Sequence, residues 1–120
     1  MHVVSRLVRA AEITDYESHG ASAGRLADGF GEAHSYVVHF EPGGAIGRHE
    51  AGYGQLFIVV VGDGWVSGDD GVQVEVRAGD VALIDRGEQH AKGSASGMTA
   101  VMVQVRDLAP PDATSTASRL

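Results

Sequence analysis

The chain has 120 residues, a formal net charge of -7 at pH 7 and no cysteine. Its length suits one domain with its own core. The negative charge argues against a nucleic-acid-binding protein, which needs a clustered basic face. The absence of cysteine excludes disulfides and thiolate metal sites, so any bound metal must be held by histidine, carboxylate, amide or water.

Residues 1–33 form a predicted N-terminal arm of strand and loop. The first nine residues are too short and too often interrupted by polar side chains for a signal or transmembrane segment, so we expect a cytoplasmic protein without membrane contacts. Residues 2–7 alternate weakly and indicate a short edge strand or one exchanged in a dimer. Residues 8–16 are the best helix candidate, although their length is marginal.

From residue 34 onward, Val-rich runs alternate with glycine-containing turns, and β-branched residues favour strands. We predict strands at residues 35–41, 55–61, 65–67, 72–77, 81–84 and 98–105, with a tight turn at 62–64 and a polar loop at 85–96. No helical periodicity separates these runs, which favours antiparallel hairpins closing into a sandwich or barrel. The barrel is expected to span residues 34–108, followed by a flexible tail at residues 109–120 that opens with two prolines.

Residues 43–62 carry the first of two glycine-framed motifs. A glycine turn leads to His49, then to Gln55 and a wholly apolar run that ends at Gly62. This spacing resembles the first motif of the cupin family: Gly, five residues, His, one residue, His, three or four residues, Glu, six residues, Gly. Gly43, His49 and Gly62 match it, whereas Ala51 replaces the second His and Gln55 replaces Glu.

Residues 79–94 resemble the second cupin motif, which runs Gly, five residues, Pro, one residue, Gly, two residues, His, three residues, Asn. Gly79, Gly87 and His90 match it, whereas Asp85 replaces Pro and Ser94 replaces Asn. Two motifs in the right order and separation are a specific signal. The chain is thus identified as a small single-domain cupin with a degenerate first motif, which implies an all-β, antiparallel, double-sheet jelly-roll barrel and a homodimer.

In metal-binding cupins, three histidines and one glutamate hold a divalent ion. Carried over by position, the resemblance implies that His49, Gln55 and His90 are the metal ligands, with a gap at Ala51. Two imidazoles and an amide oxygen suit a transition metal such as Zn, Fe, Ni or Mn, although they bring no negative charge to it. The alternative is a metal-free site in which both histidines are polar residues of the barrel mouth.

His39 is the candidate for a catalytic residue. It lies on the predicted strand before the first motif and shares a face with Val37 and Glu41. If that face points inward, His39 supplies a fourth ligand, or orients or deprotonates the substrate. The alternative is a cross-strand histidine on the surface.

Two functions are compatible with this sequence. The first is a metal-dependent enzyme that acts on an organic small molecule as an oxygenase, isomerase or cyclase. The second is a metal-free cupin that binds a small-molecule ligand without catalysis. The fold alone does not decide between them, because many activities share it.

Overall fold

The computed structural model describes residues 1–5 and 10–111. Within them the chain is built of strands and one short 3-10 turn, Asp15–Glu17, so the predicted all-β class is confirmed. The strands are β1 (His2–Ser5), β2 (Ala11–Glu12), β3 (Ser22–Ala23), β4 (Asp28–Phe40), β5 (Ala45–Glu50), β6 (Gly54–Ser67), β7 (Gln73–Arg77), β8 (Asp80–Ile84), β9 (Gln89–Gly93) and β10 (Met98–Ala109). None of the described residues forms a helix long and apolar enough to cross a membrane.

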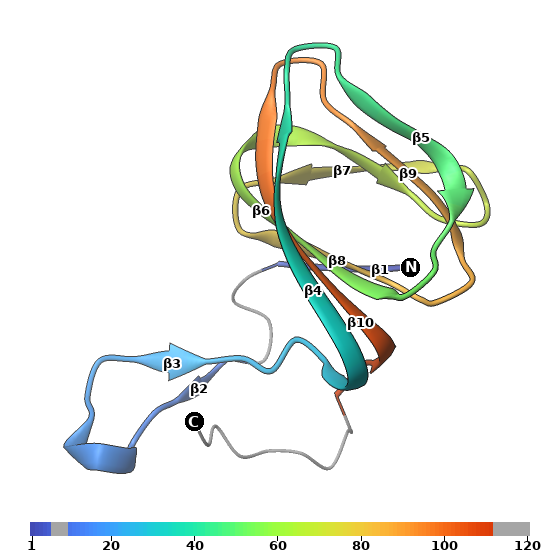
Figure 1. The fold of residues 1–120 in the computed structure, drawn as a ribbon. Helices are drawn as coiled ribbons and strands as arrows, with labels where there is room; N and C mark the ends of the chain where they lie inside the picture. The colour runs from blue at the N-terminus through green and yellow to red at the C-terminus, as the bar shows by residue number, and fades with distance from the viewer. Residues whose placement is uncertain (6–9, 112–120) are drawn as a thin grey trace.

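The strands form two antiparallel layers that share β6. The first layer has the order β1-β8-β6-β10-β4, and the second is built by β5, β9, β6 and β7. Figure 1 shows the two layers wrapped around a common interior, with the β2–β3 hairpin projecting away from the barrel. The strand order and the antiparallel pairing are those of a jelly-roll barrel.

The predicted turn at residues 62–64 is wrong, because β6 runs through it from Gly54 to Ser67. The first half of β6 pairs with β8 and β10, and the second half pairs with β7 and β9. Gly62 has a φ of 83°, and an added Cβ there would collide with the carbonyl oxygen of Gly97. The glycine therefore bends one strand from the first layer into the second instead of reversing the chain.

The predicted polar loop at residues 85–96 is also wrong in its centre, where Gln89–Gly93 forms β9. Its partner β5, Ala45–Glu50, was not predicted either. The helix candidate at residues 8–16 is contradicted over its described part, which holds β2 and the start of the 3-10 turn, while residues 8 and 9 lie outside the described chain. The expected arm contributes β1 and the first residues of β4 to the first layer.

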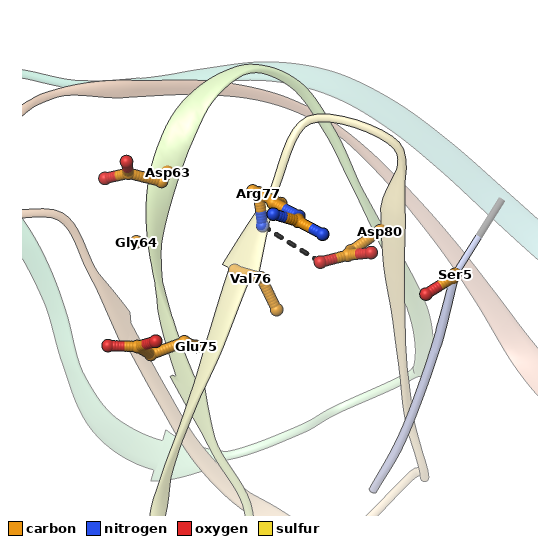
Figure 2. Close-up of a pocket in the computed structure, with 7 residues that line it drawn as sticks. All are labelled: Ser5, Asp63, Gly64, Glu75, Val76, Arg77 and Asp80. Carbon is orange, nitrogen blue, oxygen red and sulfur yellow. Dashed lines mark hydrogen bonds between the residues drawn. The ribbon is translucent and has the colours of Figure 1, made fainter.

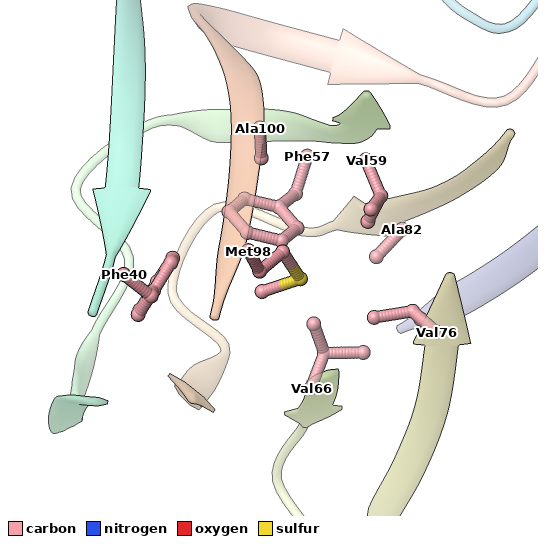
Figure 3. Close-up of a cluster of buried hydrophobic side chains, with 8 residues drawn as sticks. All are labelled: Phe40, Phe57, Val59, Val66, Val76, Ala82, Met98 and Ala100. Carbon is pink, nitrogen blue, oxygen red and sulfur yellow. The ribbon is translucent and has the colours of Figure 1, made fainter. Parts of the chain in front are cut away.

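The apolar core fills one part of the barrel interior (Figure 3). Its cluster comprises Phe40, Phe57, Val59, Val66, Val76, Ala82, Met98 and Ala100, all at most 3% exposed. The rings of Phe40 and Phe57 meet edge to face with centroids 6.2 Å apart, which is a favoured arrangement for aromatic pairs. Both layers contribute, so the cluster holds them together.

Candidate functional site

Two histidines from the two motifs lie opposite each other across the pairing of β5 with β9, with their rings tilted by 53°. His49 and His90 are register partners, and their ring centroids are 4.3 Å apart. His90 is only 1% exposed, whereas His49 is exposed to solvent. The structure therefore brings these two predicted ligands together at the edge of the interior.

The third predicted ligand, Gln55, enters the same interior from β6. It is 3% exposed and lies opposite Ile84 on one side and Gln104 on the other. Its side chain shares the inward face with Phe57, two residues later, because successive strand residues alternate between faces. Oxygen Oε1 of Gln55 is connected to His90 through hydrogen bonds to one further side chain.

That side chain is Lys92, which the sequence reasoning missed. Lys92 is 1% exposed. Its Nζ donates to Oε1 of Gln55 and to Nδ1 of His90, the latter over 3.2 Å. The ammonium also lies 5.0 Å from the centroid of the Phe57 ring, within the range of a cation–π contact. An available signal was the spacing of Lys92 from His90, since residues i and i+2 of a strand share one face.

Burial sets the charges of this cluster. It lowers the pKa of Lys92 to about 8, so that most of the lysine is an ammonium ion at pH 7. Burial, followed by the charges of Lys92 and His49, lowers the pKa of His90 to about 4, so this imidazole is neutral. The interior thus holds one positive charge beside a neutral ring.

The hydrogen bonds assign the two tautomers. Because the ammonium of Lys92 donates to Nδ1 of His90, the neutral ring carries its proton on Nε2. That Nε2 is buried and has no partner among the described residues. His49 is the reverse: its Nδ1 lies 2.7 Å from the carbonyl oxygen of Gly47, an acceptor, so its Nε2 keeps a lone pair.

The predicted three-ligand set does not fit a divalent metal in this arrangement. Oxygen Oε1 of Gln55 already accepts a hydrogen bond from Lys92, and Nδ1 of His90 faces the same ammonium. Across residues 1–5 and 10–111, no group of three or more His, Cys, Asp or Glu side chains could hold a metal ion. A cation here would meet a positive charge and no carboxylate, which is the reverse of what metal sites provide.

His39 does not join the cluster. It is exposed on the outward face of β4, between the exposed Val37 and Glu41, whereas the next residue, Phe40, points into the core. Its Nδ1 forms a 2.9 Å hydrogen bond with Oγ1 of Thr99 on β10. The cross-strand surface position, the alternative expected for this residue, is the one observed.

A polar row leads from Gln55 to the rim of the barrel. Gln104 lies between Gln55 and His34 in the register of three adjacent strands. At the rim, one carboxylate oxygen of Glu32 accepts the hydroxyl of Tyr53 at 2.8 Å and lies 2.6 Å from Nε2 of His34. These hydrogen bonds lower the pKa of Glu32 and raise the pKa of Tyr53. The contact between Tyr53 and Glu32 was not predicted from the sequence.

A separate cleft of about 560 Å³ is lined by β6, β7 and β8 and by Ser5 of β1 (Figure 2). It presents the carboxylates of Asp63, Glu75 and Asp80 around Arg77. Oδ2 of Asp80 accepts the backbone N–H of Arg77 at 3.0 Å, which fixes the turn between β7 and β8. None of the predicted site residues lines this cleft, so we leave it outside the candidate site.

Comparison with known proteins identifies relatives of this barrel. A family model described as "Cupin domain" matches residues 36–106. An (R)-mandelonitrile lyase from Granulicella tundricola is 38% identical over 71 residues, which are 58% of this chain and 54% of that protein. The chain therefore spans about half the length of this curated relative.

Solved structures show the same fold at low sequence identity. A cupin-like protein from Thermotoga maritima superposes with a TM-score of 0.59 at 22% identity, covering 70% of each chain. A predicted oxalate decarboxylase from the same organism has a TM-score of 0.57 at 19% identity, covering 88% of this chain and 99% of its own. At these identities the likeness concerns the fold alone.

Proposed function

The chain belongs to the cupin family, and on that premise we propose that it binds and acts on a small organic molecule at the cluster of His49, Gln55, His90 and Lys92. One observation carries the proposal: the buried Nε2–H of His90 has no partner among the described residues, and the other nitrogen of the same ring accepts from a buried ammonium. Leaving such a donor unpaired costs about 1–3 kcal/mol. A ligand oxygen that accepts from it would remove that cost.

The donors of the cluster define the polar end of the ligand. A lysine ammonium has three N–H donors, of which Gln55 and His90 accept two. The third N–H of the ammonium suits a carbonyl, carboxylate or enolate oxygen. Nε2–H of His90 is a separate donor for a second oxygen, because Nδ1 of the same ring faces Lys92 and Nε2 points away from it. The ring of Phe57, a member of the apolar core, borders the ammonium on its inner side.

His49 would supply the base of an acid–base reaction. Its Nε2 keeps a lone pair and its ring stands at the solvent side of His90. His49 would remove the proton of a hydroxyl or an acidic C–H group, and the ammonium of Lys92 would stabilise the negative charge that develops in the substrate. In a hydroxynitrile, loss of the hydroxyl proton lets the C–CN bond break, which gives a carbonyl group and cyanide; the proton taken by His49 then leaves with cyanide as HCN. The relative named mandelonitrile lyase makes a hydroxynitrile a suitable first substrate.

Turnover of racemic mandelonitrile, followed by the absorbance of released benzaldehyde, tests this reaction. We expect His49→Gln to lower kcat/KM by about 100-fold or more, the usual contribution of a general base. His39→Gln is the matched control, because His39 is exposed on the outer face, and should keep full activity. Equal loss in both variants, or no turnover with mandelonitrile or a panel of 2-hydroxy and 2-oxo acids, would contradict an enzymatic role and leave ligand binding alone.

A second candidate function is the metal-dependent one, in which a divalent transition metal is held by His49, Gln55 and His90. The facing imidazoles of His49 and His90 favour it, whereas the bond from Lys92 to Gln55 opposes it. Gln55→Glu separates the two, since an added carboxylate strengthens a real metal site. If the three residues converge on one ion, Gln55→Glu binds Zn²⁺ more tightly than the parent protein in a titration. An unchanged affinity would exclude this metal site, in agreement with the bond from Lys92 to Gln55.

We also propose that the protein is a homodimer that pairs through the outer face of the first layer. An apolar row runs there in register from Ile58 through Val101 to Val37. Val81, the next position in the row, is only 5% exposed. At its edge Val37 is 75% exposed, and exposed apolar faces are typical of interfaces. In sedimentation, Val37→Lys should shift the protein toward monomer, whereas Val72→Lys, at a valine that is 60% exposed outside this row, should not.

A further inference from the structure

We propose that the ammonium of Lys92 is a fixed internal cation that takes the place of a metal ion in this barrel and selects an anionic ligand. The inference rests on the proposed function only for the location of the ligand. The family resemblance implies a metal at His49, Gln55 and His90, whereas the structure places Lys92 between two of these residues.

Lys92 bridges two of the three predicted ligands. Both Gln55 and His90 turn a lone pair toward Nζ, as they would toward a metal. All three side chains are at most 3% exposed, so the ammonium is held inside the barrel and does not extend to solvent. A divalent ion held by this set would have to displace the ammonium from Gln55 and the proton from Nε2 of His90. It would then remain close to the ammonium, against Coulomb repulsion in a poorly solvated interior.

The charge of Lys92 has no opposite charge paired with it in the part of the chain that the structure describes. The carboxylate of the buried Glu88 is already engaged, because it pairs with the amino group of Met1 at 2.8 Å and accepts the backbone N–H of Asp85 at 3.1 Å. Buried charges normally have a partner of opposite sign, and a ligand carboxylate or enolate would be that partner.

The alanine of the first motif agrees with this arrangement. Ala51 stands where the resemblance implies a histidine ligand, and it is 4% exposed. Its backbone is fixed on both sides by Glu88 and Gly87, through hydrogen bonds of 2.9 and 2.8 Å. A site whose cation is part of the chain does not need this fourth ligand.

Metal content of tag-free protein, after incubation with Zn²⁺ and gel filtration, tests the inference. We expect less than about a tenth of an equivalent in the parent protein and in Ala51→His, and about one equivalent in Ala51→His/Lys92→Met, because ligand number and charge then both suit a metal. Circular dichroism checks that the variants fold. If Ala51→His prevents folding, the Lys92→Met single variant tests the same effect, and we expect its Zn²⁺ affinity to rise at least about tenfold.

Stoichiometric metal in the parent protein would overturn the inference, as would absence of any gain in both Lys92→Met variants. The ligand class is measured separately by calorimetry with benzoate and its neutral analogue benzamide. Benzoate should bind the parent at least about tenfold more tightly than benzamide, and Lys92→Met should remove this difference. Failure of both compounds to bind would count against the proposed ligand site, while the metal measurements would still decide the role of Lys92.

Discussion

The inner face of the barrel has two halves that differ in chemistry along the same strands. On β4 it changes from His34 to Phe40, and on β6 and β10 from the paired Gln55 and Gln104 to apolar residues further along. The apolar half is a closed core, whereas the polar half contains a buried ammonium and an unpaired donor. Close packing stabilises the first half, whereas the buried charge and the unpaired donor lower the stability of the second, as expected where a site is proposed.

The largest expected effect is in the apolar half. Phe40→Ala removes a side chain that is 3% exposed and packs on Phe57, so the free energy of unfolding should fall by about 3–5 kcal/mol. Urea denaturation measures it. Val37→Ala, on the outward face of the same strand and 75% exposed, is the control and should lose less than about 1 kcal/mol. Similar losses in the two variants would mean that the half around Phe40 is not closely packed.

Acid should weaken the polar half selectively. The pKa of His90 is about 4 in the folded protein, below its ordinary value of 6.5. Between these values the unfolded chain binds a proton that the folded protein does not, so stability falls as the pH falls from 6.5 to 4. The loss attributable to His90 is about 3 kcal/mol. Urea denaturation at pH 7 and pH 4 should show this extra loss in the parent protein and not in His90→Gln; parallel losses would refute it.

At the bend in β6, the cost of a positive φ can be separated from the cost of steric crowding. Gly62 and Gly43 have nearly the same φ, 83° and 84°, yet only Gly62 is crowded, by the backbone of Gly97 and Met98. We expect Gly62→Ala to lower the free energy of unfolding by about 2–3 kcal/mol and Gly43→Ala by about 1 kcal/mol. Thermal unfolding of the two variants measures the difference, and equal shifts would show that the close approach at Gly62 is relieved without cost.

The smallest effect is expected outside both halves. His39→Ala removes an exposed side chain whose one bond is to Thr99 on the neighbouring strand. Stability should change by less than about 0.5 kcal/mol, and benzoate affinity should stay the same. A clear loss of benzoate affinity in calorimetry would show that His39 contributes to the site, as the sequence-based hypothesis of a catalytic His39 proposed.

The family and the fold class followed from the sequence because the glycine-framed spacing and the Val-rich runs are local signals. Strands β5 and β9 were missed because their inward positions carry His49, His90 and Lys92, so the apolar alternation that reveals a strand is absent. Gly62 was read as a turn, since a glycine alone does not distinguish a reversal from a bend. His49 and His90 were found by spacing, but the position of Lys92 depends on β9 being a strand.

The pairing of β4 with β10 also governs how the barrel can form. Strand β4 begins at Asp28, and its register partners all lie on β10, the last strand of the described chain. Strand β10 also pairs with β6 on its other side. Such distant partners give a high contact order. This slows folding, because the entropy of closing a long loop is lost before the strand pairing stabilises the chain. During synthesis, β4 must therefore wait unpaired until almost the entire barrel sequence has emerged.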